Sequence, residues 1–224
     1  MLIIFDLDDT LVDTSGCLIY PKLEEALVKM AQAGLVLGDF KEALAQLRRL
    51  NDVAPSAKEA LAEFVEILGA DPQFLTIAMQ EMYSEEPFLF ALTPLEGAVE
   101  LLEHLRAHHT LALVTRGTPR VQMQKLEKAG IDSPLFSKIL ITQELNKKKL
   151  YKELIDELVV SPDHVFVCGD RVGPDLTPAK ELGCRTVHMK WGRGRHVILP
   201  HPDIDYSISA LADLKEIIAM CSSF

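Results

Sequence analysis

Two aspartates stand one residue apart, directly after the first apolar run of the chain. That run, Leu2–Phe5, has the length of a strand, and Asp6-Leu7-Asp8-Asp9-Thr10 follows it. Successive side chains of an extended chain point to opposite sides, so Asp6 and Asp8 can face one crevice while Leu7 packs elsewhere. The sequence therefore predicts two carboxylates at one strand end, both facing the same site.

Two later apolar runs also end in residues suited to phosphate or metal chemistry. One ends at Thr115, and another ends at Gly169-Asp170, with Asp175 five residues beyond Asp170. In an open parallel sheet, ligands bind outside the carboxyl ends of the strands. Topology alone therefore predicts that these groups converge with the first two aspartates. For Asp175, a cap on the helix that follows is the alternative.

The predicted cluster needs a cation. Carboxylates crowded together repel one another, so without a positive partner they would be protonated or would destabilise the fold. Oxygen ligands without histidine or cysteine favour a hard ion, Mg²⁺ before Zn²⁺. That ion would draw in phosphate oxygens, and the Thr115 hydroxyl would bind others. These residue types indicate nucleophilic phosphoryl transfer.

The basic side chains near this cluster leave several assignments open. Asn146–Lys149 contains three consecutive lysines at a predicted helix start. Helical periodicity favours Lys147, which shares the apolar face of that helix, as the lysine of the phosphate site. Lys148 is the second choice, and Lys149 or no lysine stays open. Arg116 is a candidate substrate contact, with an exposed loop arginine as the alternative.

Alternating strands and helices are expected to position these residues. Each predicted strand is short, apolar and rich in branched residues, as in strands buried on both faces: Leu2–Phe5, Leu111–Val114, Lys138–Ile141, Val165–Cys168 and Thr186–Met189. The helical patterns after the second, third and fourth of these are Val121–Ala129, Leu150–Val159 and Thr177–Leu182. This alternation predicts an α/β fold with a doubly wound parallel sheet.

One long segment interrupts the alternation. From about Pro21 to Tyr83, apolar residues recur with helical spacing and no convincing strand is present. The chain is expected to return to the sheet region near Pro87 and Thr93-Pro94, before a helix at Val99–Arg106. A helical insertion is therefore predicted between the first strand and the rest of the sheet.

These motifs resemble those of the haloacid dehalogenase-like hydrolase superfamily, over nearly the whole chain. Its first motif, D-x-D-x-T, matches Asp6–Thr10; its second, a Ser or Thr ending the next core strand, matches Thr115; its fourth, G-D-x-x-x-x-D, matches Gly169–Asp175. The third motif, usually Lys-Pro, departs from that form here. The helical insertion occurs where one class of these proteins carries a cap. The resemblance thus implies a Rossmann-like catalytic core from residues 1–15 and 88–224, and a helical cap from 16–87.

The resemblance also implies a role for each site residue. Asp6 would be the nucleophile that becomes an aspartyl-phosphate, and Asp8 the general acid for the leaving group, then the general base for water. Mg²⁺ would be held by the Asp6 carboxylate, the Asp8 backbone carbonyl and Asp170, with Asp175 contributing directly or through water. The predicted function is a Mg²⁺-dependent phosphatase acting on a small phosphorylated metabolite.

Three other functions are alternatives to this prediction. Dehalogenases of the superfamily lack the second aspartate of the first motif, so Asp8 disfavours that reaction. A phosphomutase would keep the same motifs and stays open as an alternative. A phosphate-sensing regulatory protein is disfavoured because receiver domains place their acid pair upstream of the phosphorylated aspartate and lack a long helical insertion.

Composition limits the partners. The 224 residues are 48% hydrophobic and 25% charged, with a formal net charge of -10, which argues against a nucleic-acid partner. The apolar start Met1–Phe5 is too short for a signal segment, and no apolar run is long enough to cross a bilayer. The expected location is cytoplasmic, without a membrane partner, and the expected state is a monomer or homodimer.

Overall fold

The computed structural model describes residues 1–83 and 91–222. The chain divides into two compact units, one formed by Met1–Thr14 with Ala91–Phe224 and the other by Ser15–Phe90. The predicted turn near Pro87 lies outside the described residues. So does the predicted boundary between the helical cap and the core, at residues 87 and 88.

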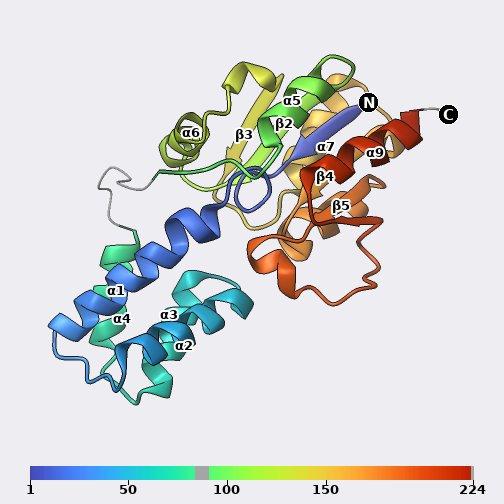
Figure 1. The fold of residues 1–224 in the computed structure, drawn as a ribbon. Helices are drawn as coiled ribbons and strands as arrows, with labels where there is room; N and C mark the ends of the chain where they lie inside the picture. Colours follow the sequence, from blue (N-terminus) through green and yellow to red (C-terminus); the bar gives the residue numbers. More distant parts are fainter. Residues whose placement is uncertain (84–90, 223–224) are drawn as a thin grey trace. The chain divides into compact units, whose positions relative to one another are not determined.

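The first unit is built on a six-stranded sheet in the order β3-β2-β1-β4-β5-β6 (Figure 1). Every neighbouring pair is parallel, which confirms the predicted α/β class. The strands are β1 (Leu2–Phe5), β2 (Thr110–Arg116), β3 (Lys138–Thr142), β4 (Val165–Gly169), β5 (Arg185–Met189) and β6 (Tyr206–Ile208). The chain passes from β1 outward on one side to β3 and then returns to β4 on the other side of β1. Such a reversal of strand order creates a crevice at the carboxyl ends of the central strands.

Helices cover both faces of this sheet, which explains the continuous apolar runs in its strands. Residues Leu2 and Ile4 of β1 belong to a buried cluster that also contains side chains of α7 (Lys148–Leu158) and α8 (Thr177–Lys180). The opposite face carries α5 (Ala98–Arg106) and α9 (Leu211–Ser222), as Figure 1 shows. The remaining helix of this unit is α6 (Pro119–Lys128), which contacts β3.

Short helical turns connect several of these elements. They are 3₁₀ helices at Ser133–Leu135, Pro162–His164 and Gly192–His196, and a π-helix, η4, at Val172–Leu176. The last of these directly follows β4 and therefore belongs to the predicted site region.

The second unit contains helices around its own apolar core. A π-helix at Ser15–Ile19 leads into α1 (Tyr20–Gln32), α2 (Phe40–Val53), α3 (Ala57–Ile67) and α4 (Gln73–Met82). Apolar stripes on these helices meet in one buried cluster, whose fully buried members include Leu27, Leu47 and Phe64. Local capping fixes two helix starts: the Asp39 carboxylate accepts from the backbone N–H of Glu42 at 2.9 Å, and Ser56 caps α3.

The described part of the chain contains no strand between β1 and β2. Two elements were not predicted, namely β6 and α9. Strand β6 has only three residues and follows a turn-rich segment, so its apolar pattern is too short to stand out. No helix among the described residues combines the length and apolar character needed to cross a membrane.

Candidate active site

The functional side chains lie at the carboxyl ends of three neighbouring strands. Phe5, the last residue of β1, pairs with Leu113 of β2 on one side and with Cys168 of β4 on the other. Asp6 continues β1 by one residue, and its backbone N–H donates to the Cys168 carbonyl at 2.9 Å. Thr115 and Asp170 lie two residues beyond these partners. The parallel register therefore brings all three to one edge of the sheet.

A buried acidic triad forms at this edge. One carboxylate oxygen from each of Asp6, Asp170 and Asp175 lies within 4.8 Å of the others. All three residues are buried, with exposed fractions of 7%, 3% and 2% respectively. Carboxylates this close and this dry cannot all be ionised without a positive partner.

Lys147 supplies part of that positive charge. Its Nζ donates to Asp6 Oδ1 and to Asp175 Oδ1, each at 2.6 Å, and the side chain is only 2% exposed. Lys147 is the residue that precedes the first turn of α7, so this helix start delivers its ammonium group to the triad. Burial by itself lowers the pKa of Lys147, but Asp175 and Asp6 outweigh it and hold the pKa well above its usual value. The two carboxylates therefore favour the charged form of this ammonium.

Lys147 does not balance the triad completely. Burial raises the pKa of Asp6 to about 7; Lys147 opposes this shift, while Asp175 and Asp8 add to it. Burial also raises the pKa of Asp170 well above its usual range, and Asp175, Asp9 and Asp6 act in the same direction. A bound cation would favour the ionised forms of these carboxylates.

Asp175 reaches the triad because Gly169 has no side chain. A Cβ on Gly169 would lie 2.7 Å from Asp175 Cβ and 2.8 Å from its Oδ2. Asp175 sits in the π-helix η4 (Val172–Leu176), and its Oδ2 accepts from the backbone N–H of Arg171 at 3.0 Å. No side-chain hydrogen bond caps α8, so the alternative role of Asp175 as a helix cap is not observed.

Asp8 has different partners from the triad. Its Oδ1 accepts from Lys125 Nζ at 2.6 Å and from Thr14 Oγ1 at 2.5 Å, and its Oδ2 accepts from Gln122 Nε2 at 3.0 Å. Burial by itself would raise the pKa of Asp8. The Lys125 ammonium and these hydrogen bonds outweigh burial and lower the pKa below its usual value. Asp6 and Asp8 are two residues apart, yet their pKa values move in opposite directions.

Thr115 is joined to Asp8 through α6. The buried Gln122 side chain donates from Nε2 both to Asp8 and, at 2.7 Å, to Thr115 Oγ1. Because the hydroxyl oxygen accepts from Gln122, the Thr115 hydroxyl proton remains available for another acceptor. Gly117 makes room for this arrangement, since a Cβ there would lie 2.9 Å from Gln122 Cδ.

The sequence matches the haloacid dehalogenase-like hydrolase family over residues 3–189. The chain belongs to this family. It is similar to the glyceraldehyde 3-phosphate phosphatase of Methanocaldococcus jannaschii, with 29% identity over 225 residues that cover 96% of each chain. Among solved structures, a predicted phosphoglycolate phosphatase from Haemophilus somnus superimposes with a TM-score of 0.72 at 21% identity, covering 97% of each chain. The haloacid dehalogenase-like hydrolase YfnB from Bacillus subtilis, solved bound to magnesium, has a TM-score of 0.67 at 20% identity and the same coverage. These two structures share the fold of this chain.

The triad of this haloacid dehalogenase-like hydrolase fits Mg²⁺ by its donor set. The ligand atoms are carboxylate oxygens, and a hard divalent cation prefers oxygen. Burial first, and neighbouring carboxylates after it, raise the pKa values of Asp6 and Asp170. When ionised, the three carboxylates carry an excess of negative charge over the Lys147 ammonium that contacts them. A divalent cation would offset that excess, so the chemistry of the site favours one.

Two candidate residues are not brought into the cluster. The Lys148 ammonium pairs with Glu181 at 2.8 Å, and its side chain is 45% exposed. Arg116 is exposed, and its Nε donates to the carbonyl of Gln143 at 3.3 Å. Of Lys147, Lys148 and Arg116, it is therefore Lys147 whose side chain reaches the acidic triad.

Several functional contacts were not predicted from the sequence. They come from Thr14, Gln122 and Lys125, which surround Asp8. One signal was present in the sequence. Gln122 and Lys125 are three residues apart on α6 and lie on the same side of the helix as Leu126, which is buried. Polar side chains at such positions are not expected to face solvent. Polar residues on the buried side of a helix that follows a motif strand are candidates for this kind of contact.

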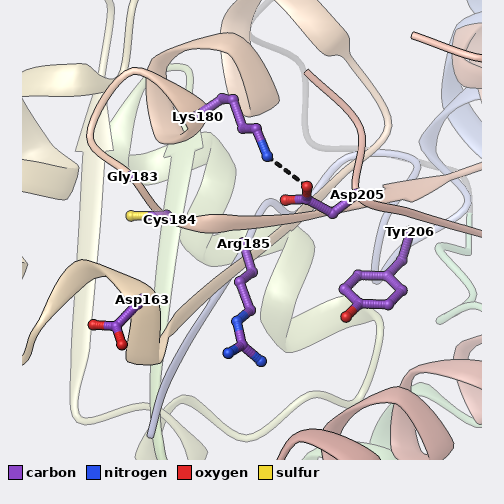
Figure 2. Close-up of a pocket in the computed structure, with 7 residues that line it drawn as sticks. All are labelled: Asp163, Lys180, Gly183, Cys184, Arg185, Asp205 and Tyr206. Atoms are coloured by element: carbon purple, nitrogen blue, oxygen red, sulfur yellow. Dashed lines mark hydrogen bonds and ion pairs between the residues drawn. The ribbon is translucent and has the colours of Figure 1, made fainter. Parts of the chain in front are cut away.

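A separate cavity lies at the opposite edge of the sheet (Figure 2). It has a volume of about 390 Å³ and is lined by residues at the amino ends of β4, β5 and β6, among them Asp163, Arg185 and Asp205. Lys180 pairs with Asp205 at its wall, and the Arg185 guanidinium lies over the Phe166 ring at 5.3 Å. Because it lies at the amino ends of the strands and none of the motif aspartates lines it, this cavity is not the candidate active site.

Proposed function

We propose that this chain is a Mg²⁺-dependent phosphatase that hydrolyses a small phosphorylated metabolite through an aspartyl-phosphate on Asp6. The observation that carries the proposal is the contrast between the two aspartates of the first motif. Asp6 lies in the acidic triad with Lys147, whereas Asp8 lies beside it in a separate set of donors. Two carboxylates held by different sets of donors are suited to different chemical roles, and the resemblance of the first motif, not the direction of their pKa shifts, assigns the nucleophile to Asp6 and the acid to Asp8.

The first half of the reaction is assigned to Asp6 as nucleophile and Asp8 as acid. An oxygen of the Asp6 carboxylate forms a bond to phosphorus while the bond from phosphorus to the substrate oxygen breaks. Asp8 gives its proton to that departing oxygen, which leaves as an alcohol. The product is the phosphorylated Asp6 side chain and the Asp8 carboxylate.

The second half regenerates the enzyme. The Asp8 carboxylate takes a proton from water, the water oxygen bonds to phosphorus, and the bond from phosphorus to the Asp6 oxygen breaks. Inorganic phosphate leaves, and both aspartates return to their starting states. This use of one residue first as acid and then as base requires that Asp8 be held in one place during both steps, which its several donors support.

The other site residues bind and orient. Lys147 supplies a fixed positive charge for phosphate oxygens, and Thr115 supplies a hydroxyl proton. Asp6, Asp170, Asp175 and the backbone carbonyl of Asp8 are proposed as the ligands of Mg²⁺. When bound, Mg²⁺ would offset the repulsion between a phosphate dianion and the attacking carboxylate. This local charge reconciles an anionic substrate with a chain whose formal charge is -10.

The helical unit is proposed as a cap that selects the substrate. It is inserted in the chain directly after the loop that carries Asp6 and Asp8, with its own buried core. A cap of this kind would exclude water and disfavour bulky protein substrates. The names of relatives such as the Methanocaldococcus phosphatase make glyceraldehyde 3-phosphate the first substrate to test. A monomer or homodimer in the cytoplasm is the proposed state of the protein.

The test is a screen of small phosphate esters, beginning with glyceraldehyde 3-phosphate and p-nitrophenyl phosphate, in Mg²⁺ and in EDTA. The wild-type protein should release inorganic phosphate, rather than an isomerised sugar phosphate, only in Mg²⁺. Asp6→Asn should abolish release, and Asp163→Asn, at an exposed residue across the sheet, should leave it unchanged. Full activity of Asp6→Asn, or of the wild-type protein in EDTA, would overturn the proposal.

A further inference from the structure

Two side chains of α6 contact Asp8, although they lie more than a hundred residues away in the sequence. Lys125 Nζ donates to Asp8 Oδ1 at 2.6 Å, and Gln122 Nε2 donates to Asp8 Oδ2 at 3.0 Å. The reaction proposed above mentions them only as donors that hold Asp8. Their position beside the acid–base group calls for an explanation.

Both side chains are buried, so neither is an ordinary surface side chain whose polar group is hydrated by solvent. Lys125 is 7% exposed and Gln122 is 1% exposed. Removing an ammonium group or an amide from water is unfavourable unless its hydrogen bonds are replaced. Asp8 provides one replacement for each of them. The contacts are therefore part of the folded structure and not chance encounters of mobile side chains.

The donors distinguish the two oxygens of the Asp8 carboxylate. Oδ1 accepts from two donors, the Lys125 ammonium and the Thr14 hydroxyl at 2.5 Å, while Oδ2 accepts from the Gln122 amide. Rotation of the carboxylate would break all three bonds at once. The arrangement thus fixes which oxygen faces Lys125 and which faces Gln122.

Gln122 also connects Asp8 with the phosphate-binding residue. Its Nε2 donates at 2.7 Å to Thr115 Oγ1, so one amide group spans the acid–base residue and the hydroxyl that would bind phosphate. A fixed separation between these two groups sets the distance between the proton donor and the phosphorus it serves. Displacements of about 1 Å in such a geometry can reduce rates by roughly 10²-fold.

We propose that Lys125 and Gln122 are positioning residues that act through Asp8, orienting its carboxylate for proton transfer. The inference rests on the proposed function, because it requires Asp8 to be the acid and base. The positioning role predicts a selective effect. Substitutions of Lys125 or Gln122 should slow the steps in which Asp8 transfers a proton and leave the other steps nearly unchanged. A role in folding alone would not have this selectivity.

The test compares two leaving groups. Phenol is a much poorer leaving group than p-nitrophenol, so phenyl phosphate needs proton donation from Asp8 far more than p-nitrophenyl phosphate does. For Lys125→Met, we expect kcat/KM to fall about 100-fold with phenyl phosphate and less than about fivefold with p-nitrophenyl phosphate, since general acid catalysis contributes roughly 10²–10⁴-fold. Gln122→Leu should show the same pattern more weakly, and serves as the second variant if the first folds poorly.

A second measurement follows the water step. With p-nitrophenyl phosphate, Lys125→Met should release about one p-nitrophenol per enzyme in a rapid burst, because Asp8 as a misplaced base slows hydrolysis of phosphorylated Asp6. Lys128→Met, an exposed residue on the same helix, is the matched control and should behave as wild type. Thermal unfolding of each variant checks the fold.

The results separate two failures. Asp8→Asn, measured in parallel, should show the same dependence on leaving group; if it does not, the proposed function itself is wrong. If Asp8→Asn shows that dependence but Lys125→Met and Gln122→Leu lower kcat/KM equally for both substrates, or not at all, the positioning role is refuted while the proposed function stands.

Discussion

Gly169→Ala is the substitution that most sharply tests the geometry of the acidic triad. The new Cβ would lie 2.7 Å from Asp175 Cβ, whereas carbon atoms in contact are separated by about 3.5 Å or more. Asp175 would therefore have to move by roughly 0.8 Å. Gly169 does not have the left-handed backbone conformation that favours glycine, so this overlap is the main cost of the substitution.

The displacement would weaken contacts on both oxygens of Asp175. Oδ1 accepts from Lys147 at 2.6 Å and Oδ2 from the Arg171 N–H at 3.0 Å, so neither has spare length. We expect a loss of about 1–3 kcal/mol in unfolding free energy from overpacking. Activity should fall further, by about 100-fold, because misplacement near 1 Å disrupts the alignment of reacting groups. The Mg²⁺ concentration for half-maximal activity should rise.

Gly173→Ala provides the control for this prediction. Gly173 lies in η4, the π-helix that also carries Asp175, and a Cβ there would have no heavy atom within 4 Å. Phosphate release at increasing Mg²⁺ and thermal unfolding would be measured for both variants. Gly173→Ala should remain within about threefold of wild type, since it introduces no overlap. If Gly169→Ala keeps both wild-type activity and wild-type Mg²⁺ dependence, the triad does not depend on Asp175 as argued.

Three further predictions concern stability. Each tenfold increase in Mg²⁺ above its dissociation constant should add about 1.4 kcal/mol to unfolding free energy in wild type and far less in Asp170→Asn, as measured by thermal unfolding. Lys147→Met should cost about 3–5 kcal/mol in EDTA because buried carboxylates lose their ammonium partner, and Mg²⁺ should restore part of it; equal losses in both buffers would contradict this. Burial by itself would raise the pKa of Asp205, but hydrogen bonds and charge from Lys180 and Thr186 outweigh burial and lower it. The Asp205 carboxylate therefore stabilises the fold at pH values above its unfolded pKa. This stabilisation is lost as the pH falls through the lower pKa of the folded state. Asp205→Asn should therefore lose about 1 kcal/mol at pH 7 and progressively less below about pH 4 in urea unfolding; a constant difference would refute the assignment.

The sheet and the motif strands were predictable because their signals are local. Each of the five long strands is an apolar run bounded by polar or turn residues, and the polar residue that follows it marks its carboxyl end. Asp6, Thr115 and Asp170 could be placed together from this information and from the parallel topology. Strand β6, by contrast, is formed by Tyr206–Ile208 and depends on pairing with β5, which its own pattern does not reveal.

The partners of Asp8 were not predictable in the same way. Lys125 reaches Asp8 across 117 positions of sequence, and only the packing of α6 onto the sheet brings them together. A lysine in a helix is normally solvated, so its residue type gave no indication of burial. Gly169 is a similar case: its place in the motif was recognised, but the overlap with Asp175 became visible only in three dimensions.

The two aspartates of the first motif show why spacing alone assigns no chemistry. The buried ammonium of α7 holds Asp6 among other carboxylates, and burial raises the pKa of Asp6 to about 7. Asp8 is held by α6, whose Lys125 lowers the pKa that burial would otherwise raise. Since different helices, carried by different strand ends, control the two environments, a substitution on α6 can alter proton transfer without removing the nucleophile. The two aspartates thus differ in environment because Lys147 pairs with one and Lys125 with the other, although they are only two residues apart in the chain.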